Sequence, residues 1–179
     1  MKTISFALLL FVASFFASPP QEPVKPTAPI ASASQIPVPF LWFEGRAEEA
    51  ARYYCSIFPD SKVEQASSQV VTFRLHGQRF MALNGGPHYR LSPAYSMFVP
   101  CKDQAEVDRL WDALLANGGR PDQCGWLVDR FGLSWQVVPT RLVELLTHQD
   151  AAIRERTMNA MMPMQKIDLA AIERAVGTM

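Results

Sequence analysis

The three histidines are the side chains best suited to acid–base chemistry or metal binding near neutral pH. His76 lies between two strand-like runs, His88 follows a glycine-rich break, and His148 follows a helical stretch. These positions fall on different expected elements and share no spacing, so the sequence predicts no joint histidine site. His88 is kept as a ligand-binding candidate because it lies beside the glycine-rich crossing at the edge of the expected sheet.

Three cysteines, Cys55, Cys101 and Cys124, are the next reactive side chains. Their odd number and the absence of a CxxC spacing fit neither a zinc site nor a complete disulfide set. Two states remain open. One is a single disulfide with one free thiol, which an oxidising compartment allows. The other, which we favour, is three buried thiols that pack as small apolar residues.

Two carboxylates, Glu44 and Asp129, lie near the ends of expected strands. General acid–base chemistry often uses a pair of such groups held within reach of each other. Nothing in the sequence brings these two residues together, and the simplest expectation is that both are solvated.

The elements that must position these residues follow from hydrophobic periodicity and from turn residues. The first half contains a strand at 37–43, a helix at 47–58, and strands at 61–66, 70–75 and 78–83. The second half repeats this order with a strand at 95–99, a helix that begins at Asp103, and strands at 126–129 and 133–138. Glu106, three residues after Asp103, predicts a capping box. Three amphipathic stretches at 140–146, 151–162 and 169–176 predict C-terminal helices.

The N-terminal residues have a different character from the rest of the chain. Lys2 is followed by an almost wholly apolar run at 4–16, too short to span a bilayer comfortably but typical of a secretory signal. We assign 1–18 to this segment, 19–36 to a proline-rich linker, and 37–179 to one folded domain. The expected location is therefore periplasmic or secreted, and the alternative is an uncleaved segment that anchors the domain to a membrane.

The overall charge argues against a polyanionic partner. The chain has 17 lysine and arginine residues against 17 aspartate and glutamate residues. It also lacks a dense basic run, so we expect no nucleic-acid binding.

Several longer motifs resemble one known family. They are PFLWF at 39–43, AEEA at 47–50 with Tyr53 and Tyr54, FMALNGGP at 80–87, CGW at 124–126 and FGLSWQVVP at 131–139. Together they resemble the PhnB-like branch of the vicinal-oxygen-chelate superfamily, which includes glyoxalases, bleomycin-resistance proteins and dioxygenases, over about 37–176. The resemblance implies an α+β fold in which two βαβββ modules form a cupped mixed sheet, followed here by C-terminal helices.

Members of this branch are often labelled 3-demethylubiquinone methyltransferases. A methyltransferase of the usual kind needs a glycine-rich turn between a strand and a helix for its nucleotide-like cofactor. The Gly85-Gly86 pair is instead followed by Pro87 and another strand-type segment. The sequence therefore does not support methyl transfer.

The resemblance also implies a divalent metal in the cup, held by His, Glu or Gln from four strands. The corresponding positions in this chain are Pro39, Ala82, Ser96 and Gln136. Only Gln136 is a conventional ligand, and a shift by two positions offers the weak ligand Asn84. We therefore expect no metal cofactor, and a divalent metal fits only if this placement is wrong.

The remaining candidates are the walls of a small-molecule pocket. Gln136, Asn84 and Ser96 offer hydrogen bonds, and Trp42 offers a broad apolar face, although the tryptophans could equally belong to the core. Residues alternate between faces along a strand, so if Gln136 lines the cup, Trp135 must pack beneath a helix.

Three functions remain compatible with these observations. The favoured one is a metal-free protein that binds a small molecule. The second is a metal-dependent lyase or dioxygenase of the glyoxalase superfamily, and the third is a dimeric interaction protein without a ligand. The resemblance further implies a homodimer, with the cup completed across the two subunits.

Overall fold

The computed structural model describes residues 36–177. The expected signal-like segment and nearly all of the proline-rich linker lie outside these residues. Within 36–177, no helix is both long enough and apolar enough to cross a membrane.

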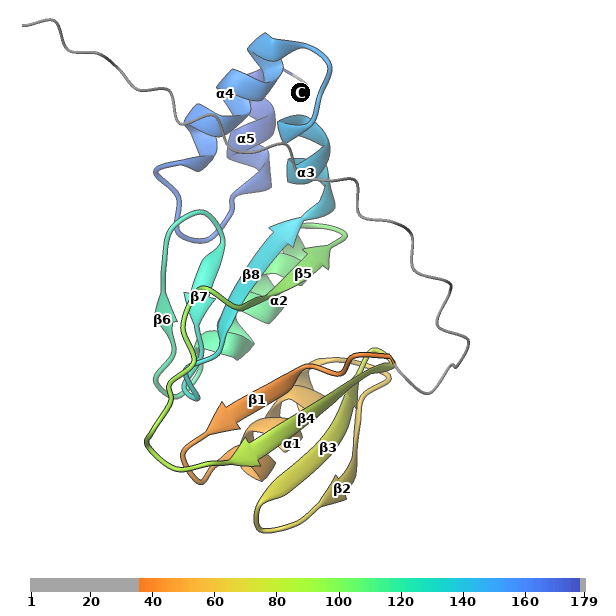
Figure 1. Cartoon of the computed structure of the whole chain (residues 1–179). Coiled ribbons are helices and arrows are strands. Elements are labelled where there is room, and N and C mark those ends of the chain that lie inside the picture. The colour runs from red at the N-terminus through yellow and green to blue at the C-terminus, as the bar shows by residue number, and fades with distance from the viewer. Residues whose placement is uncertain (1–35, 178–179) are drawn as a thin grey trace, which may run out of the picture. The chain divides into compact units, whose positions relative to one another are not determined.

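The first module is a four-stranded mixed sheet with one helix against it (Figure 1). Its elements are β1 (Phe40–Phe43), α1 (Ala47–Ile57), β2 (Lys62–Ala66), β3 (Val70–Leu75) and β4 (Gln78–Asn84), and the strand order is β1-β4-β3-β2. β1 and β4 are parallel, with Phe40 opposite Met81, and the other pairs are antiparallel. Leu41 and Phe43 are buried in the core shared with α1, whereas Phe40 is half exposed on the opposite, open face of the sheet.

The second module repeats this arrangement. Its elements are β5 (Ser96–Cys101), α2 (Gln104–Leu115), β6 (Arg120–Pro121), β7 (Trp126–Val128) and β8 (Ser134–Pro139), in the order β5-β8-β7-β6. The α+β fold of two βαβββ modules is therefore confirmed. β6 was not predicted, because two residues that include a proline carry no strand periodicity.

The predicted cap of α2 forms with a small difference. The Asp103 carboxylate accepts a hydrogen bond from the Glu106 backbone N–H at 2.9 Å. The Glu106 carboxylate accepts one in return from the N–H of Lys102, also at 2.9 Å, one residue before the N-cap itself. Both bonds satisfy donors that the helix or its approach would otherwise leave unpaired.

The C-terminal helices α3 (Thr140–Leu146), α4 (Ala151–Met161) and α5 (Leu169–Val176) form a separate small core. Its buried residues are Val138, Leu142, Leu145, Ile167, Ile172 and Val176. The segment that leads into α5 pairs with the second module, because the N–H groups of Cys124 and Gly125 donate to the carbonyls of Met164 and Gln165, both at 2.7 Å.

All three cysteines are free thiols. Cys101 is fully buried, and this burial raises the pKa of its thiol to about 12. Cys55 and Cys124 are half-buried. The favoured expectation of three fully buried thiols therefore holds for Cys101 and only partly for the other two.

Candidate functional site

Gln136 and Ser96 lie side by side on the open face of the second sheet. The Gln136 Nε2 donates to the Ser96 Oγ at 2.8 Å. Trp135 and Val137, the alternate residues of β8, are fully buried on the other face. The predicted alternation is therefore observed, and Trp135 belongs to the core.

Trp42 occupies the end of β1 and packs on the glycine-rich turn that follows β4. Its indole Nε1 donates to the carbonyl of Gly86 at 2.8 Å. The ring lies so close to Gly85 that a Cβ at that position would overlap it. Glycine is therefore required at position 85 by the approach of the tryptophan ring, which gives the motif at 80–87 a structural reason.

A cavity of about 410 Å³ opens where the end of β1, the connection between the modules and the β6–β8 edge come together. Trp42, Tyr89 and Phe131 form its aromatic walls, and Ser134 lies in the wall on the sheet side. Trp42 and Tyr89 meet edge to face with their ring centroids 4.9 Å apart. A pocket of this size with aromatic walls and a few polar groups suits a small organic molecule.

Two other predicted ligand contacts lie elsewhere. The Asn84 Oδ1 accepts from the N–H of Ala47 at 2.8 Å, and its Nδ2 donates to the carbonyl of Ser68 at 2.9 Å. Its amide therefore ties β4 to the start of α1 and to the turn before β3. His88 is exposed in the connection between the modules and is not part of the cavity wall, although Tyr89 and Arg90 are. Binding roles for Asn84 and His88 remain predictions.

Asp129 corrects the expectation of a solvated carboxylate, because only 3% of it is exposed. Its Oδ2 accepts from the Tyr54 hydroxyl and from the Trp135 Nε1, each at 2.8 Å. Its Oδ1 accepts from the N–H groups of Phe131 at 2.8 Å and Leu133 at 3.1 Å. Burial raises the pKa of Asp129, and these four hydrogen bonds oppose the shift. The carboxylate links α1 of the first module to the β7–β8 hairpin of the second.

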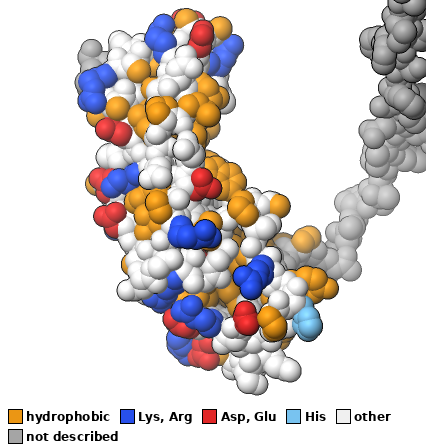
Figure 2. Space-filling model, turned by 90° about the vertical axis from the view of Figure 1, so that its left-hand side faces the viewer, with side chains coloured by type: hydrophobic (Ala, Val, Ile, Leu, Met, Phe, Trp, Pro, Cys, Tyr) orange, Lys and Arg blue, Asp and Glu red, His pale blue; other side chains and the backbone are white. Residues whose placement is uncertain are grey.

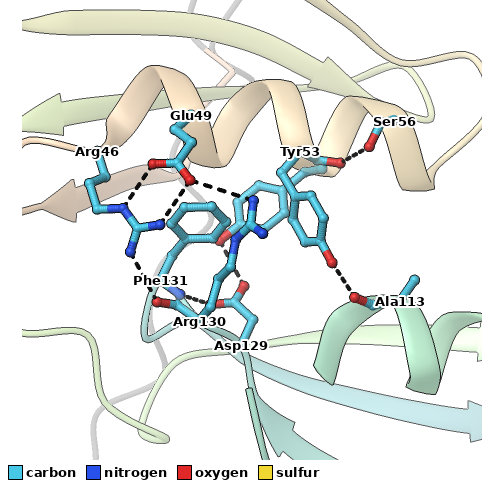
Figure 3. Close-up of polar contacts among 9 residues, drawn as sticks. Arg46, Glu49, Tyr53, Ser56, Ala113, Asp129, Arg130 and Phe131 are labelled. Atoms are coloured by element: carbon cyan, nitrogen blue, oxygen red, sulfur yellow. Dashed lines mark hydrogen bonds and ion pairs between the residues drawn. The ribbon is translucent and has the colours of Figure 1, made fainter. Parts of the chain in front are cut away.

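The same hairpin turn is held from outside by charged and aromatic contacts (Figure 3). Glu49 of α1 pairs with Arg46 at 2.8 Å and with Arg130 at 3.5 Å. The Arg130 guanidinium lies over the rings of Tyr53 and Phe131, 4.1 and 4.7 Å from their centroids. The Tyr53 hydroxyl donates to the carbonyl of Ala113 in α2. These contacts fix the turn that carries Arg130 and Phe131 at the cavity.

Sequence reasoning did not find this junction. The Asp129 to Gly132 spacing is typical of a turn in which an aspartate accepts from its own backbone, and it could have signalled the two backbone bonds. The hydroxyl of Tyr54, which donates to Asp129, lies 75 positions away in the sequence, so no pattern near Asp129 indicates this bond.

The metal positions implied by the resemblance do not converge. Ala82 is fully buried in the core on the α1 side of its sheet, whereas Ser96 and Gln136 lie on the open face of the other. The open-face neighbours in the first module, Phe40 and Met81, offer at most a thioether. Among residues 36–177, no group of three or more His, Cys, Asp or Glu side chains is placed to hold a metal ion. This donor set does not fit a hard divalent cation.

Comparisons with known proteins agree with this architecture. The family described as 3-demethylubiquinone-9 3-methyltransferase matches residues 35–138, which is more than half of the chain. The resemblance proposed from the motifs extended to about residue 176, so the three C-terminal helices lie outside the matched range. No curated protein sequence matches this chain.

Among solved structures, a putative 3-demethylubiquinone-9 3-methyltransferase, a PhnB protein from Bacillus cereus, is 30% identical and has a TM-score of 0.52. The match covers 59% of this chain and 99% of that one. A glyoxalase/bleomycin-resistance protein from Albidiferax ferrireducens is 15% identical over 57% of this chain and 95% of its own, with a TM-score of 0.42.

A further match is the fosfomycin-resistance protein FosX from Listeria monocytogenes, in a complex with Mn(II) and sulfate. It is 16% identical over 58% of this chain and 88% of its own, with a TM-score of 0.43. The range matched by the family and the 30% identity to the Bacillus cereus protein identify this chain. It belongs to the 3-demethylubiquinone-9 3-methyltransferase family of PhnB-like proteins.

Proposed function

We propose that this chain binds a small organic molecule in the cavity between its two modules. The observation that carries this proposal is the cavity itself, about 410 Å³ in volume, with Trp42, Tyr89 and Phe131 as aromatic walls. Ligand sites commonly combine such apolar walls with a few fixed polar groups.

The polar groups continue from the cavity onto the open face of the second sheet. Ser134 lies in the cavity wall and pairs in register with Ser96 on the neighbouring strand. Ser96 is hydrogen-bonded to Gln136 on the same face. Ser96 and Gln136 do not line the cavity themselves, but a ligand that extends from it past Ser134 along the open face would meet this pair. Both residues therefore remain ligand-binding candidates alongside Trp42.

We propose further that binding needs no resident metal and involves no methyl transfer. The first statement rests on the donor set at the open faces, which lacks convergent carboxylate and imidazole groups. The second rests on the turn after β4. The chain continues from Gly85-Gly86 through the connection to β5, so within 36–177 this turn does not lead into a cofactor-binding helix.

Catalysis is less well supported than binding. Glu44 is the one carboxylate among residues 36–177 that lines the cavity, and Asp129 is buried outside its wall with four hydrogen bonds. Paired acid–base chemistry would need a second group in reach. Export, or anchoring through the N-terminal segment, remains a prediction because that segment lies outside the described residues.

The experiment that tests this proposal uses three probes of nearly the same shape and different charge, namely benzoate, benzamide and benzamidine. Each is titrated into the ¹⁵N-labelled protein while the indole N–H resonance of Trp42 is followed, with Trp42→Phe used to assign that resonance. We expect at least one probe to shift the resonance saturably. The variant Gly85→Ala, which displaces the Trp42 ring, should weaken that binding about tenfold or more.

Two outcomes would contradict the proposal. If none of the three probes perturbs Trp42 at millimolar concentration, the cavity is not a binding site. If elemental analysis of the purified protein finds one tightly held divalent metal per chain, the metal-free proposal is wrong and the lyase or dioxygenase alternative gains support.

A further inference from the structure

We infer that the ligand of this cavity is an anion, a carboxylate or phosphate compound that also carries an apolar group. This inference rests on the proposed binding function and adds the chemical class of the ligand.

The first observation is the charge of the cavity wall. Arg90, Arg120 and Arg130 line the cavity, whereas Glu44 is its one lining carboxylate among the described residues. Arg90 and Arg120 form no ion pair with any residue of 36–177, although many arginines elsewhere in the fold do. Arginines paired with carboxylates include Arg46, Arg52, Arg74, Arg79 and Arg141. Arg90 and Arg120 therefore bring positive charge to the cavity that no ion pair within residues 36–177 neutralises, whereas Arg130 is paired with Glu49.

The second observation is the placement of these arginines by the fold. Register pairs Arg120 with Val128, and Val128 with Ser134, so Arg120 and Ser134 lie in one row across the same sheet face. Arg130 is carried by the hairpin turn that Asp129 fixes, and Arg90 comes from the connection between the modules. Three separate segments thus bring arginine residues to the wall of one cavity, and guanidinium groups match carboxylate and phosphate oxygens in geometry and charge.

The third observation is a set of buried polar atoms without partners. Ser134 is 1% exposed, and its hydroxyl has no hydrogen-bond partner among the described residues. The Nε of Arg130 is also buried without a partner, although its Nη2 pairs with Glu49. Leaving a buried donor unpaired costs about 1–3 kcal/mol. Both groups can donate a hydrogen bond, and the oxygen atoms of a bound carboxylate or phosphate could accept both of these bonds.

The aromatic walls alone would also suit a cation, because an organic cation is attracted to the face of an aromatic ring. The arginines decide against this. Arg130 is paired with Glu49, so a cation in the cavity would meet the two arginines without an ion pair, Arg90 and Arg120, against the single lining carboxylate Glu44. The same rings can instead hold the apolar part of an anion, as the edge-to-face pair of Trp42 and Tyr89 provides a flat surface.

The test compares probe charges at constant ionic strength and adds phenyl phosphate to benzoate, benzamide and benzamidine. We expect benzoate or phenyl phosphate to bind at least about tenfold more tightly than benzamide, and benzamidine to bind most weakly. The two anions distinguish a carboxylate site from a phosphate site, and tighter binding of either one supports the inference.

The variant Arg120→Gln tests the assigned residue. It should raise the dissociation constant of the preferred anion about tenfold and leave that of benzamide unchanged. Arg174→Gln, an exposed arginine of α5 far along the chain from the cavity residues, is the matched control and should change neither value. Thermal unfolding of both variants checks that the fold is retained.

Equal affinity for benzamide and the anions would overturn the anionic class while leaving the cavity as a binding site. If Arg120→Gln loses affinity for benzamide as well as for the anions, Arg120 maintains the shape of the cavity and does not select for negative charge. Binding of none of the probes would overturn the proposed function itself.

Discussion

At the scale of single residues, Asp129 is a buried carboxylate that accepts four hydrogen bonds. A buried carboxylate is costly unless hydrogen bonds compensate for the lost water, and here four donors surround it. Tyr54 and Trp135 supply two of these donors and are themselves fully buried. The loss of any one donor leaves a charged acceptor partly unsatisfied in the core.

We therefore predict that Tyr54→Phe lowers the free energy of unfolding by about 1–3 kcal/mol at pH 7. The substitution also removes a pH dependence. Burial and the neighbouring Asp129 charge raise the pKa of Tyr54 well above its ordinary value. Above about pH 10 the unfolded tyrosine ionises while the folded one does not, so stability falls as pH rises.

Urea unfolding between pH 7 and pH 11 measures both effects. The fall in stability above pH 10 should be smaller in Tyr54→Phe than in the wild type. Tyr89→Phe, in which an exposed hydroxyl is lost, is the control and should keep the wild-type stability at pH 7. An unchanged stability of Tyr54→Phe would show that the Asp129 contact contributes little.

The sequence predicted some residue placements and missed others for a physical reason. Strand alternation placed Gln136 on the open face and Trp135 in the core, because a period of two is a local property. It could not reveal that Asp129 is buried, since the hydroxyl that compensates it comes from the other module. The cavity arginines were missed in the same way, because Arg90, Arg120 and Arg130 come together only through tertiary packing.

At the scale of secondary structure elements, several contacts attach α5 to the second module, and one side chain makes two of them. The Gln104 amide, in the first turn of α2, donates to the carbonyl of Ile167 and accepts from the N–H of Leu169, both at 2.9 Å. Lys166 adds an ion pair with Asp108 at 2.9 Å. The chain that leads into α5 is therefore fastened to α2 on one side and to the Cys124-Gly125 backbone on the other.

Gln104→Ala should lower the free energy of unfolding by about 1–3 kcal/mol, because it leaves two half-buried backbone groups without partners. The loss should be local, with faster amide hydrogen exchange at Leu169 and through α5. Gln65→Ala, in which an exposed glutamine of β2 is removed, is the matched control. Uniformly faster exchange over both modules would indicate that α5 unfolds together with the whole domain.

Most helices and strands could be predicted from the sequence because their hydrophobic periodicity extends over enough residues to be recognised. The helices and the longer strands match the expected ranges within a few residues, and the capping box at Asp103 was recognised. The sequence did not predict the two-residue strand β6. It also did not predict that residues 164–165 pair with Cys124 and Gly125. Backbone pairing of this kind leaves no pattern of side chains in the sequence.

At the scale of the whole described chain, the open faces of both sheets carry exposed aromatic residues. Phe40 in β1 is 51% exposed and Phe98 in β5 is 50% exposed. On the face shown in Figure 2, basic and acidic side chains are interspersed with hydrophobic ones. We propose that a second copy of the chain covers these open faces in a homodimer.

Sedimentation equilibrium at tens of micromolar protein should give twice the monomer mass. Phe98→Asp, which places a charge on the open face, should shift the protein to monomers without loss of its circular dichroism signal. Met158→Asp on α4 removes a similarly exposed apolar side chain, 43% exposed, and should leave the dimer intact. A wild-type protein that sediments as a monomer would contradict the homodimer.

The contact between Tyr54 and Asp129 also bears on how such a protein can diverge. The two modules follow the same plan, which suggests that they could be exchanged or recombined as equivalent parts. Each, however, contributes one half of a single buried contact, the hydroxyl from the first and the carboxylate from the second. A substitution in one module therefore changes which substitutions the other tolerates, and a chimera that inherits its modules from two relatives keeps the stability of this contact only if it inherits both halves.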